Sequence, residues 1–345
     1  MQLFVSEFIC SGACPSTEGF DSMRGEGQAM LLAVLDALSD VPDCRVASTW
    51  DARWPVPQME FVDWHLITQG PRQESDLFCQ LASESEISLI IAPESNGILS
   101  DRCRLVEVSG GKLAGPSSLA VATCSDKLLV CDLLTQHGIP TPPTTPLMEG
   151  VEPLDSFPLL IKPRDGAGSQ HTRLITNQQD WNACQHDVQQ GVLPAMIQQV
   201  FQPGIPRSVA LLVDAAESTV QFWPACDQRF SHDGHFEFLG GRIDSASALS
   251  PSLCQDLSKL CRCLSGVQGY IGVDLICPSD GARPWVVDIN PRLTTSFLGY
   301  QRLTADNLGE WLIGHNGDRH VRWSGRTVEF GSSNTAHDAS VIVCS

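Results

Sequence analysis

Residues Tyr270–Arg292 (YIGVDLICPSDGARPWVVDINPR) combine two apolar segments with acidic and amide side chains. An Asp-Gly pair between the segments is a turn signal, and it predicts a β-hairpin. If the hairpin is centred on Gly281, Asp274 lies directly opposite Asp288. Because strand side chains alternate with a period of two, Asn290 shares a face with Asp288. Two carboxylates and a carboxamide are therefore predicted to converge on one side of the hairpin.

Two carboxylates in a directly opposed cross-strand pair repel each other unless a cation lies between them. Magnesium takes oxygen ligands of this kind together with water and nucleotide phosphate oxygens, and Mn²⁺ is the expected substitute. The pattern therefore predicts a metal site formed by Asp274, Asp288 and Asn290. The alternative, in which both aspartates only face solvent on the sheet surface, stays open here. The opposite face of the hairpin is predicted to be buried, and it carries Val273, Leu275, Val287 and Ile289.

A second chemical pattern lies in Phe157–Ser169 (FPLLIKPRDGAGS). An apolar strand ends at Lys162-Pro163, and the loop that follows contains Gly166, Gly168 and Ser169. Glycines let backbone N–H groups approach an anion closely, and a lysine at the end of a strand supplies a point charge for phosphate. The pattern predicts a phosphate-binding loop, with an ordinary turn as the alternative. Arg292, directly after the acidic hairpin, could reach the same phosphate.

The elements that must position these residues change in type along the chain. In the first 120 residues, strand-length apolar runs alternate with helical patterns, which predicts parallel strands joined by helical crossovers. The expected strands are Leu3–Phe8, His65–Thr68 and Ser88–Ala92, and the expected helices are Gly25–Leu38 and Leu77–Ser85. We therefore assign the chain to the α/β class.

One long helix is predicted over Pro116–His137, and it contains Ser125-Asp126-Lys127. Gly138 ends this helix, and the proline-rich stretch Ile139–Pro153 prevents its continuation. Strands dominate beyond this stretch, so an α+β pattern is expected in the C-terminal part. The expected strands are Leu159–Pro163, Arg173–Thr176, Ala195–Phe201, Ser208–Val213, Val220–Pro224, Tyr270–Cys277 and Trp285–Asn290, and the expected helices are Gln179–Gln190 and Ser252–Leu264.

Composition narrows the class of function. The chain has 345 residues, and 22 Lys and Arg against 40 Asp and Glu give a formal net charge of −18. Such an acidic protein is poorly suited to bind nucleic acid or an anionic membrane surface, since both need basic side chains. Met1–Cys10 lacks the pattern of a secretory signal, and the fourteen scattered cysteines fit a reducing compartment, which predicts a cytoplasmic protein.

Together and in their order along the chain, the chemical motifs resemble the ATP-grasp superfamily over roughly Ser117–Gly314. The motifs that make the resemblance specific are Ser125-Asp126-Lys127, Ile161-Lys162-Pro163 with its glycine loop, Gly272-Val273-Asp274 and Val287-Asp288-Ile289-Asn290-Pro291-Arg292. The resemblance implies an N-terminal parallel α/β pre-ATP-grasp domain and two lobes that clamp ATP. The corresponding boundaries are 1–116 for the N-terminal domain, 117–202 for the small lobe with its lead-in helix, 203–330 for the large lobe with the magnesium site, and 331–345 for a loosely held tail.

The same resemblance implies roles for individual residues. Lys127 and Lys162 would contact the ATP phosphates, and the loop with Gly166, Gly168 and Ser169 would close over them. The adenine hinge would consist of Gln199, Val200 and Phe201. Magnesium would be held by Asp274, Asp288 and Asn290, and Arg292 would stabilise the transferred phosphoryl group. The family usually has a glutamate where Asp288 stands, and Gln199 replaces a common acidic residue.

A narrower resemblance points to the branch that contains tyramine–glutamate ligase of methanofuran-type cofactor synthesis. It rests on Asn290–Ser296, on Gly240-Gly241 after Gln228, and on Glu26–Met30. It implies substrate contacts by Gln228, Gly241, Thr294 and Thr295. The segment Gln228–Asp244 is expected to be a substrate-facing loop, because His232 and His235 alone make an incomplete zinc site.

The implied function is an ATP-dependent carboxylate–amine ligase that forms an amide through an acyl-phosphate. Glutamate and tyramine or a tyrosine-like amine are the small-molecule substrates that the branch suggests, and homodimers are frequent among such ligases. Two alternatives stay open. One is a bicarbonate-using carboxylase or carbamoyl-phosphate-type enzyme, and the other is an ATP-binding regulatory module without turnover.

Overall fold

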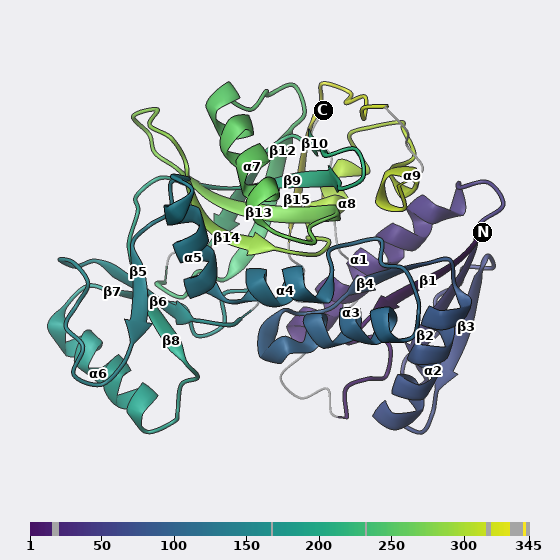
Figure 1. Ribbon diagram of the computed structural model, residues 1–345, viewed down its shortest axis with the longest axis horizontal. Helices are drawn as coiled ribbons and strands as arrows, with labels where there is room; N and C mark the ends of the chain where they lie inside the picture. The colour runs from purple at the N-terminus through teal and green to yellow at the C-terminus, as the bar shows by residue number, and fades with distance from the viewer. Residues whose placement is uncertain (16–20, 167, 232, 315–318, 332–340, 343–345) are drawn as a thin grey trace.

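The computed structural model describes residues 1–15, 21–166, 168–231, 233–314, 319–331 and 341–342. Three β-sheets form its framework, one in the N-terminal part and two in the rest of the chain (Figure 1). Most of the predicted tail, 331–345, lies outside the described residues, as does His232. The first sheet is parallel and the other two are antiparallel, which confirms the predicted α/β class with its α+β C-terminal part.

The N-terminal sheet has four parallel strands in the order β3-β2-β1-β4. Its strands are β1 (Gln2–Glu7), β2 (Arg45–Asp51), β3 (Val62–Ile67) and β4 (Ile87–Ile91), and its helices are α1 (Asp21–Ser39), α2 (Pro71–Glu84), η1 (Ser95–Gly97) and α3 (Ile98–Val108). Side chains of β1 alternate between two cores: Leu3 and Val5 pack with α1, whereas Phe4 packs with α2 and α3. Helices therefore cover both faces of the sheet, as a buried parallel sheet requires. The strand β2 and the helix α3 were not predicted.

The predicted helix over Pro116–His137 is wrong as a single element. Two helices, α4 (Ser118–Ser125) and α5 (Lys127–Gln136), meet at Asp126, whose backbone is extended. The Asp126 carboxylate accepts hydrogen bonds from the N–H groups of Leu128 and Leu129 and so caps α5. A short acidic side chain competes for free N–H groups in this way, which ends one helix and begins the next. The break places Lys127 at the first turn of α5.

The small sheet has four antiparallel strands in the order β5-β8-β6-β7. Its elements are β5 (Thr144–Leu147), β6 (Leu159–Pro163), β7 (Arg173–Ile175), β8 (Met196–Val200) and the helix α6 (Gln178–Gln189). The helix buries Trp181 and Cys184 against Leu159 and Ile161 of β6. The sheet therefore has one apolar face under α6, and β6 carries Lys162 near its end.

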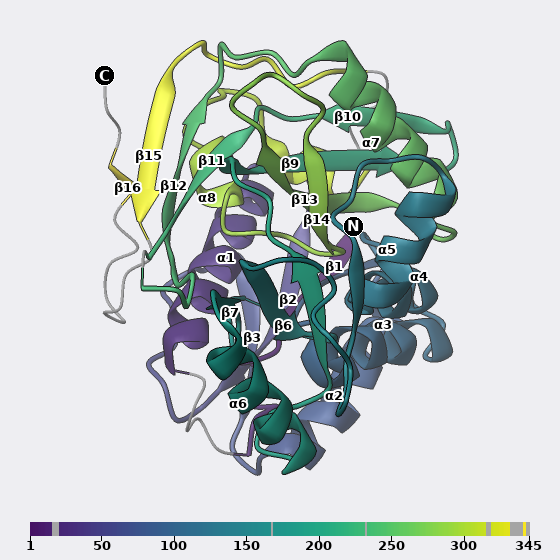
Figure 2. The same ribbon diagram turned by 90° about the vertical axis from the view of Figure 1, so that its left-hand side faces the viewer.

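The third sheet has eight strands along the path β14-β13-β9-β11-β12-β15-β16, with β10 beside β9 (Figure 2). Its strands are β9 (Ile205–Asp214), β10 (Thr219–Phe222), β11 (Cys226–Phe230), β12 (Phe238–Asp244), β13 (Gly269–Cys277), β14 (Trp285–Asn290), β15 (Thr327–Gly331) and β16 (Val341–Ile342), and its helices are α7 (Pro251–Cys263), α8 (Phe297–Tyr300) and α9 (Leu308–Leu312). The apolar face of α7 packs on β9 and β13 through Leu257 and Leu260.

The segment Gln228–Asp244, expected to be a loop, lies mostly within the paired strands β11 and β12. Close packing of neighbouring strands explains the glycines at positions 240 and 241. A Cβ at Gly240 would lie 2.1 Å from the Phe330 carbonyl oxygen, and one at Gly241 would lie 2.5 Å from Cys226 Sγ. The glycines therefore allow β12 to pass close to β15 and β11.

The hairpin β13–β14 has the predicted register at its functional end. Asp274 pairs with Asp288, and Gly272 pairs with Asn290. The register then shifts after Asp274, so Val286 rather than Val287 points into the core. The prediction that Val287 is buried is wrong for this reason: a bulge reverses the facing of the residues beyond it.

Neither disulfides nor membrane-spanning helices occur in the described part of the chain. The thirteen cysteines located there are free thiols, and most are buried. None of the described helices is long and apolar enough to cross a bilayer.

We predict that Asp126→Ala destabilises the protein by about 1 kcal/mol, because the variant loses the cap of α5. Asp132→Ala is the matched control, since Asp132 is an exposed acid in the same helix and should change stability by less than about 0.5 kcal/mol. Urea unfolding followed by circular dichroism measures both. Equal midpoints for the two variants would show that the cap contributes nothing.

Candidate active site

A cavity of about 1040 Å³ lies where the three sheets meet. Its walls include Glu7 from β1, Lys162 from β6, Asp274 from β13 and Asp288 from β14. Segments more than 200 residues apart in the sequence thus share one cavity. Cavities between sheets and domains are common sites for small-molecule ligands.

The acidic hairpin forms one part of the cavity wall through Asp274, Asp288 and Asn290. Asn290 Nδ2 donates to Asp274 Oδ2 at 2.9 Å, and Gln228 Nε2 donates to Asp274 Oδ1 at 3.1 Å. Burial and the nearby Asp288 carboxylate raise the pKa of Asp274 to about 6. The two acids therefore share a crowded negative site, which is the condition that a divalent cation relieves.

The donor set suits magnesium better than zinc. Two carboxylates and a carboxamide offer only oxygen as metal ligand, which magnesium prefers. Among the described residues, no group of three or more His, Cys, Asp or Glu is placed to hold a metal ion. His235 lines the cavity without such companions.

Lys127 neutralises part of the charge on the acidic hairpin. Its Nζ lies 3.0 Å from Asp288 Oδ2 and donates to the Gly166 carbonyl oxygen at 3.1 Å. Burial alone would lower the pKa of Lys127, but the Asp288 carboxylate outweighs burial, and the pKa is raised. Lys127 does not line the cavity itself. Its ammonium group lies beside Asp288 and outside the cavity lining, where it supplies positive charge to the Asp288 carboxylate.

Lys162 lines the cavity and is 7% exposed. Its Nζ donates to the Val287 carbonyl oxygen at 3.0 Å, next to the register shift in the hairpin. Burial lowers the pKa of Lys162 to about 8, although Asp288 acts in the opposite direction. A bound phosphate would supply the negative charge that this buried ammonium lacks.

Arg292 reaches the cavity from the end of the acidic hairpin. Its Nε lies 2.8 Å from Glu94 Oε1, and Glu94 follows β4 in the N-terminal domain. Burial lowers the pKa of Arg292, but Glu94 outweighs it, and the pKa is raised. The ion pair fixes the guanidinium across the boundary between two sheets.

The glycine loop lies at the cavity, and hydrogen bonds join it and its neighbours to other segments of the chain. Gly168 and Ser169 line the cavity, and Gly166 binds Lys127 through its carbonyl oxygen. The Asn96 N–H, from the N-terminal domain, donates to Asp165 Oδ2 at 2.8 Å. In addition, the Leu174 N–H of β7 donates to the Gly234 carbonyl oxygen at 3.2 Å, which joins the small lobe to the β11–β12 hairpin. Hydrogen bonds therefore join the small sheet and its glycine loop to the other two parts of the chain around the cavity.

The structure places most of the other predicted site residues at the cavity. Gln199, Val200 and Phe201 line it at the end of β8, and the Gln199 side chain donates to Thr144 Oγ1 at 2.9 Å. The wall also includes Gln228, Thr294 and Thr295. Gly241 does not line the cavity, and a Cβ at this position would lie against Cys226 and Phe330.

Several cavity residues were not predicted. These are Glu7, Ile9, Met23, Glu26, Met30, Phe230, Phe236 and Phe238. The Glu26–Met30 segment had been noted only for its likeness to one branch. Glu7 follows an apolar strand at its C-terminal end, and ligands gather at that end of parallel sheets, so its position was a usable signal.

Comparison with known protein families decides the class of the protein. The model of the ATP-grasp domain matches residues 124–296, half of the chain, and that of the pre-ATP-grasp 3 domain matches residues 44–121. The chain belongs to the ATP-grasp family. The resemblance drawn from the sequence motifs is thereby confirmed, and so is the predicted ATP-grasp fold.

Individual relatives and structures agree with this family. The tyramine–L-glutamate ligase of Methanocaldococcus jannaschii is 26% identical over 258 residues, which cover 74% of this chain and 71% of the relative. A structure from Archaeoglobus fulgidus assigned to the ATP-grasp superfamily aligns with a TM-score of 0.70 and 23% identity, covering 96% of this chain and 92% of that one. The L-amino acid ligase of Bacillus licheniformis aligns with a TM-score of 0.66 and 15% identity, covering 96% and 79%.

The protein is therefore an enzyme of the ATP-grasp ligase class, which binds ATP and forms carbon–nitrogen bonds between small molecules. The residues predicted for the adenine hinge, the phosphate contacts and the metal site fall within the matched segment 124–296. The N-terminal domain supplies Glu7, Glu26 and Glu94 from outside it.

We predict that Asp288→Asn and Asp274→Asn each weaken the Mg²⁺ dependence of ADP binding by at least about tenfold. Even indirect partners of a metal ligand typically contribute that much to metal affinity. Titration calorimetry with and without Mg²⁺ measures the effect. Asp280→Asn, in the exposed turn of the same hairpin, is the control and should behave like the unchanged protein. Full Mg²⁺ dependence in both site variants would remove these residues from the metal site.

We predict that nucleotide binding takes up a proton at pH 8.5, up to about one per ADP, and less at pH 7. The free protein holds Lys162 with a pKa of about 8, so the lysine is mostly neutral at pH 8.5. Bound phosphate favours the charged form, and ADP affinity should therefore fall as the pH rises above 8. Calorimetry in buffers of different ionisation enthalpy counts the protons. Lys162→Arg stays charged throughout and should take up none, whereas equal uptake in both proteins would contradict the assignment.

Proposed function

We propose that this enzyme joins the carboxylate of glutamate to the amine of tyramine or a tyrosine-like compound, with ATP converted to ADP and phosphate. The observation that carries the proposal is the meeting of Lys162, the paired Asp274 and Asp288, and Arg292 in one cavity. These residues suit a triphosphate and an acyl-phosphate, since all carry charge that phosphoryl transfer must balance. The similarity to tyramine–L-glutamate ligases supports this choice of substrates.

The substrate carboxylate attacks the γ-phosphorus of ATP, and ADP leaves as the acyl-phosphate forms. Lys162 binds the phosphates, Arg292 balances charge on the phosphoryl oxygens, and Lys127 turns from Asp288 towards the nucleotide when that carboxylate is engaged elsewhere. Asp274, Asp288 and Asn290 would hold Mg²⁺, or Mn²⁺ in its place, and the metal supplies neutralisation of the triphosphate charge. The amine then attacks the acyl carbon and phosphate leaves, which forms the amide.

Exclusion of water supports this chemistry, because an acyl-phosphate hydrolyses when water reaches it. We infer that the contacts of the small lobe, Asn96 to Asp165 and Leu174 to Gly234, help to exclude water from the cavity. We accordingly propose that the segments 117–202 and 203–330 act as the two clamping lobes and that 1–116 forms the third wall. Gln199, Val200 and Phe201 would hold the adenine between the lobes.

Substrate contacts fall to the polar residues that follow the metal ligands. Thr294 and Thr295 line the cavity beyond Arg292, and Gln228 reaches both the cavity and Asp274. These three residues would bind the acid substrate. Gly241 would act only through packing. A cytoplasmic location and a homodimer remain part of the proposal.

We predict phosphate release that requires both an acid and an amine, with glutamate and tyramine as the best pair in a panel that includes tyrosine and other amines. Mass spectrometry should find a product equal to glutamate plus tyramine minus water. The Asp288→Asn variant serves as the comparison for background phosphate release. Its rate of phosphate release should be at least about 100-fold lower, because phosphoryl transfer depends on charge neutralisation.

Two other outcomes would overturn the proposal. Phosphate release with bicarbonate and no amino acid would assign the enzyme to the carboxylating class instead. Tight ATP binding without ADP production across the whole panel would favour a regulatory module.

A further inference from the structure

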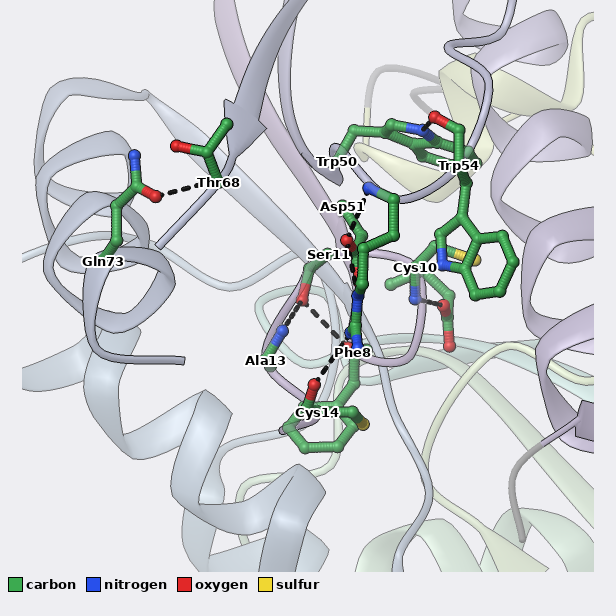
Figure 3. Close-up of polar contacts among 12 residues, drawn as sticks. Phe8, Cys10, Ser11, Ala13, Cys14, Trp50, Asp51, Trp54, Thr68 and Gln73 are labelled. Atoms are coloured by element: carbon green, nitrogen blue, oxygen red, sulfur yellow. Dashed lines mark hydrogen bonds and ion pairs between the residues drawn. The ribbon is translucent and has the colours of Figure 1, made fainter. Parts of the chain in front are cut away.

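Glu7 ends β1 and lines the cavity, and the residue is only 2% exposed. The Cys10 N–H donates to Glu7 Oε2 at 2.7 Å. The loop that provides this N–H is itself fixed, because Ser11 Oγ donates to the Phe8 carbonyl oxygen and accepts from the Ala13 N–H (Figure 3). The carboxylate is therefore held in one place at the cavity wall.

Glu7 differs from the other buried acids of the N-terminal domain. Each of the others forms an ion pair with an arginine: Asp51 with Arg53, Glu74 with Arg102, and Glu94 with Arg292. Within the described part of the chain, no ion pair includes Glu7. A buried carboxylate without an ion-pair partner is costly, so its retention calls for a ligand that supplies one.

Gly27 makes room for the Glu7 carboxylate at the cavity wall. A Cβ at position 27 would lie 2.5 Å from Glu7 Oε1, so Gly27 is needed for the carboxylate to occupy its place. The same wall carries the apolar side chains of Ile9, Met23 and Met30. An acid beside apolar side chains is complementary to an amine with an apolar body.

The position of Arg292 relative to Glu7 indicates that an amine bound at Glu7 would lie near the reacting carbon. Arg292 is close enough for its charge to act on Glu7 and lower its pKa in part. Arg292 also follows Asn290 of the metal site, where the acyl-phosphate would form. The amine bound at Glu7 would therefore face the acyl group from the N-terminal side.

We propose that Glu7 binds the ammonium group of the amine substrate and accepts its first proton, an assignment that rests on the proposed ligase function. The ammonium gives one proton to the Glu7 carboxylate and becomes a neutral amine with a free lone pair. That pair forms the C–N bond as the C–O bond to phosphate breaks, and the leaving phosphate takes the second proton. The products are the amide, phosphate and protonated Glu7, which then loses its proton to solvent.

Burial raises the pKa of Glu7 to about 7, which agrees with this role. A base that exchanges protons near neutral pH works in both directions of a transfer, since it accepts the proton and releases it again.

The test compares two nucleophiles on Glu7→Gln at pH 7, with glutamate and ATP saturating. Hydroxylamine is largely neutral at this pH and needs no base, so hydroxamate formation should stay within about threefold of the unchanged enzyme. Amide formation with tyramine should fall about 100-fold, the contribution typical of a positioned base. Glu7→Asp keeps the charge and should recover part of the amide rate.

Asp256→Asn is the control, because Asp256 is a buried acid of α7 that pairs with an arginine and does not line the cavity. It should leave the ratio of amide to hydroxamate unchanged. If Glu7→Gln lowers both products equally, or neither, the role of Glu7 is refuted while the ligase function stands. If the unchanged enzyme forms neither product with any acid, the ligase function fails and the role of Glu7 falls with it.

Discussion

The repulsion between Asp274 and Asp288 is the constraint on which the site depends. The pairing of β13 with β14 places the two carboxylates directly opposite each other at the cavity wall. Each acid has a different compensation: Asp274 accepts hydrogen bonds from two amide side chains, and Asp288 binds the Lys127 ammonium. These partners reduce the repulsion without removing it: the pKa of Asp274 stays raised, first through burial and then through the nearby Asp288 carboxylate. Two carboxylates that still repel each other bind an added positive charge favourably.

The rest of the cavity distributes charge around that pair. Lys162 is a buried cation whose nearest partner is a neutral carbonyl oxygen, and Glu7 is a buried acid whose nearest partner is a backbone N–H. Both would gain a charged partner from substrates, the first from phosphate and the second from an ammonium group. Arg292 lines the same cavity and is fixed by Glu94. Burial thus prepares one cavity for ligand groups of opposite charge, which is how preorganised sites stabilise reacting groups.

The sequence predicted the part of the site that depends on local pattern. Strand alternation and the Asp-Gly turn were enough to pair Asp274 with Asp288, but not to find the bulge that turns Val286 inward, since a bulge depends on packing against neighbouring elements. Asp126 was taken as a helix residue because its own capping bonds have no periodic signature. The place of Glu7 at the end of an apolar strand is visible in the sequence, but its lack of an ion-pair partner is a tertiary property. The arginines that pair with the other buried acids form no ion pair with Glu7 in the described part of the chain.

The most direct test is a crystal structure of the protein with ADP and Mn²⁺, in which anomalous scattering locates the metal. The account predicts a manganese peak bound by Asp274, Asp288 and Asn290, with Lys127 moved from Asp288 to a phosphate oxygen. A peak elsewhere in the cavity, or Lys127 still paired with Asp288 while nucleotide is bound, would contradict it.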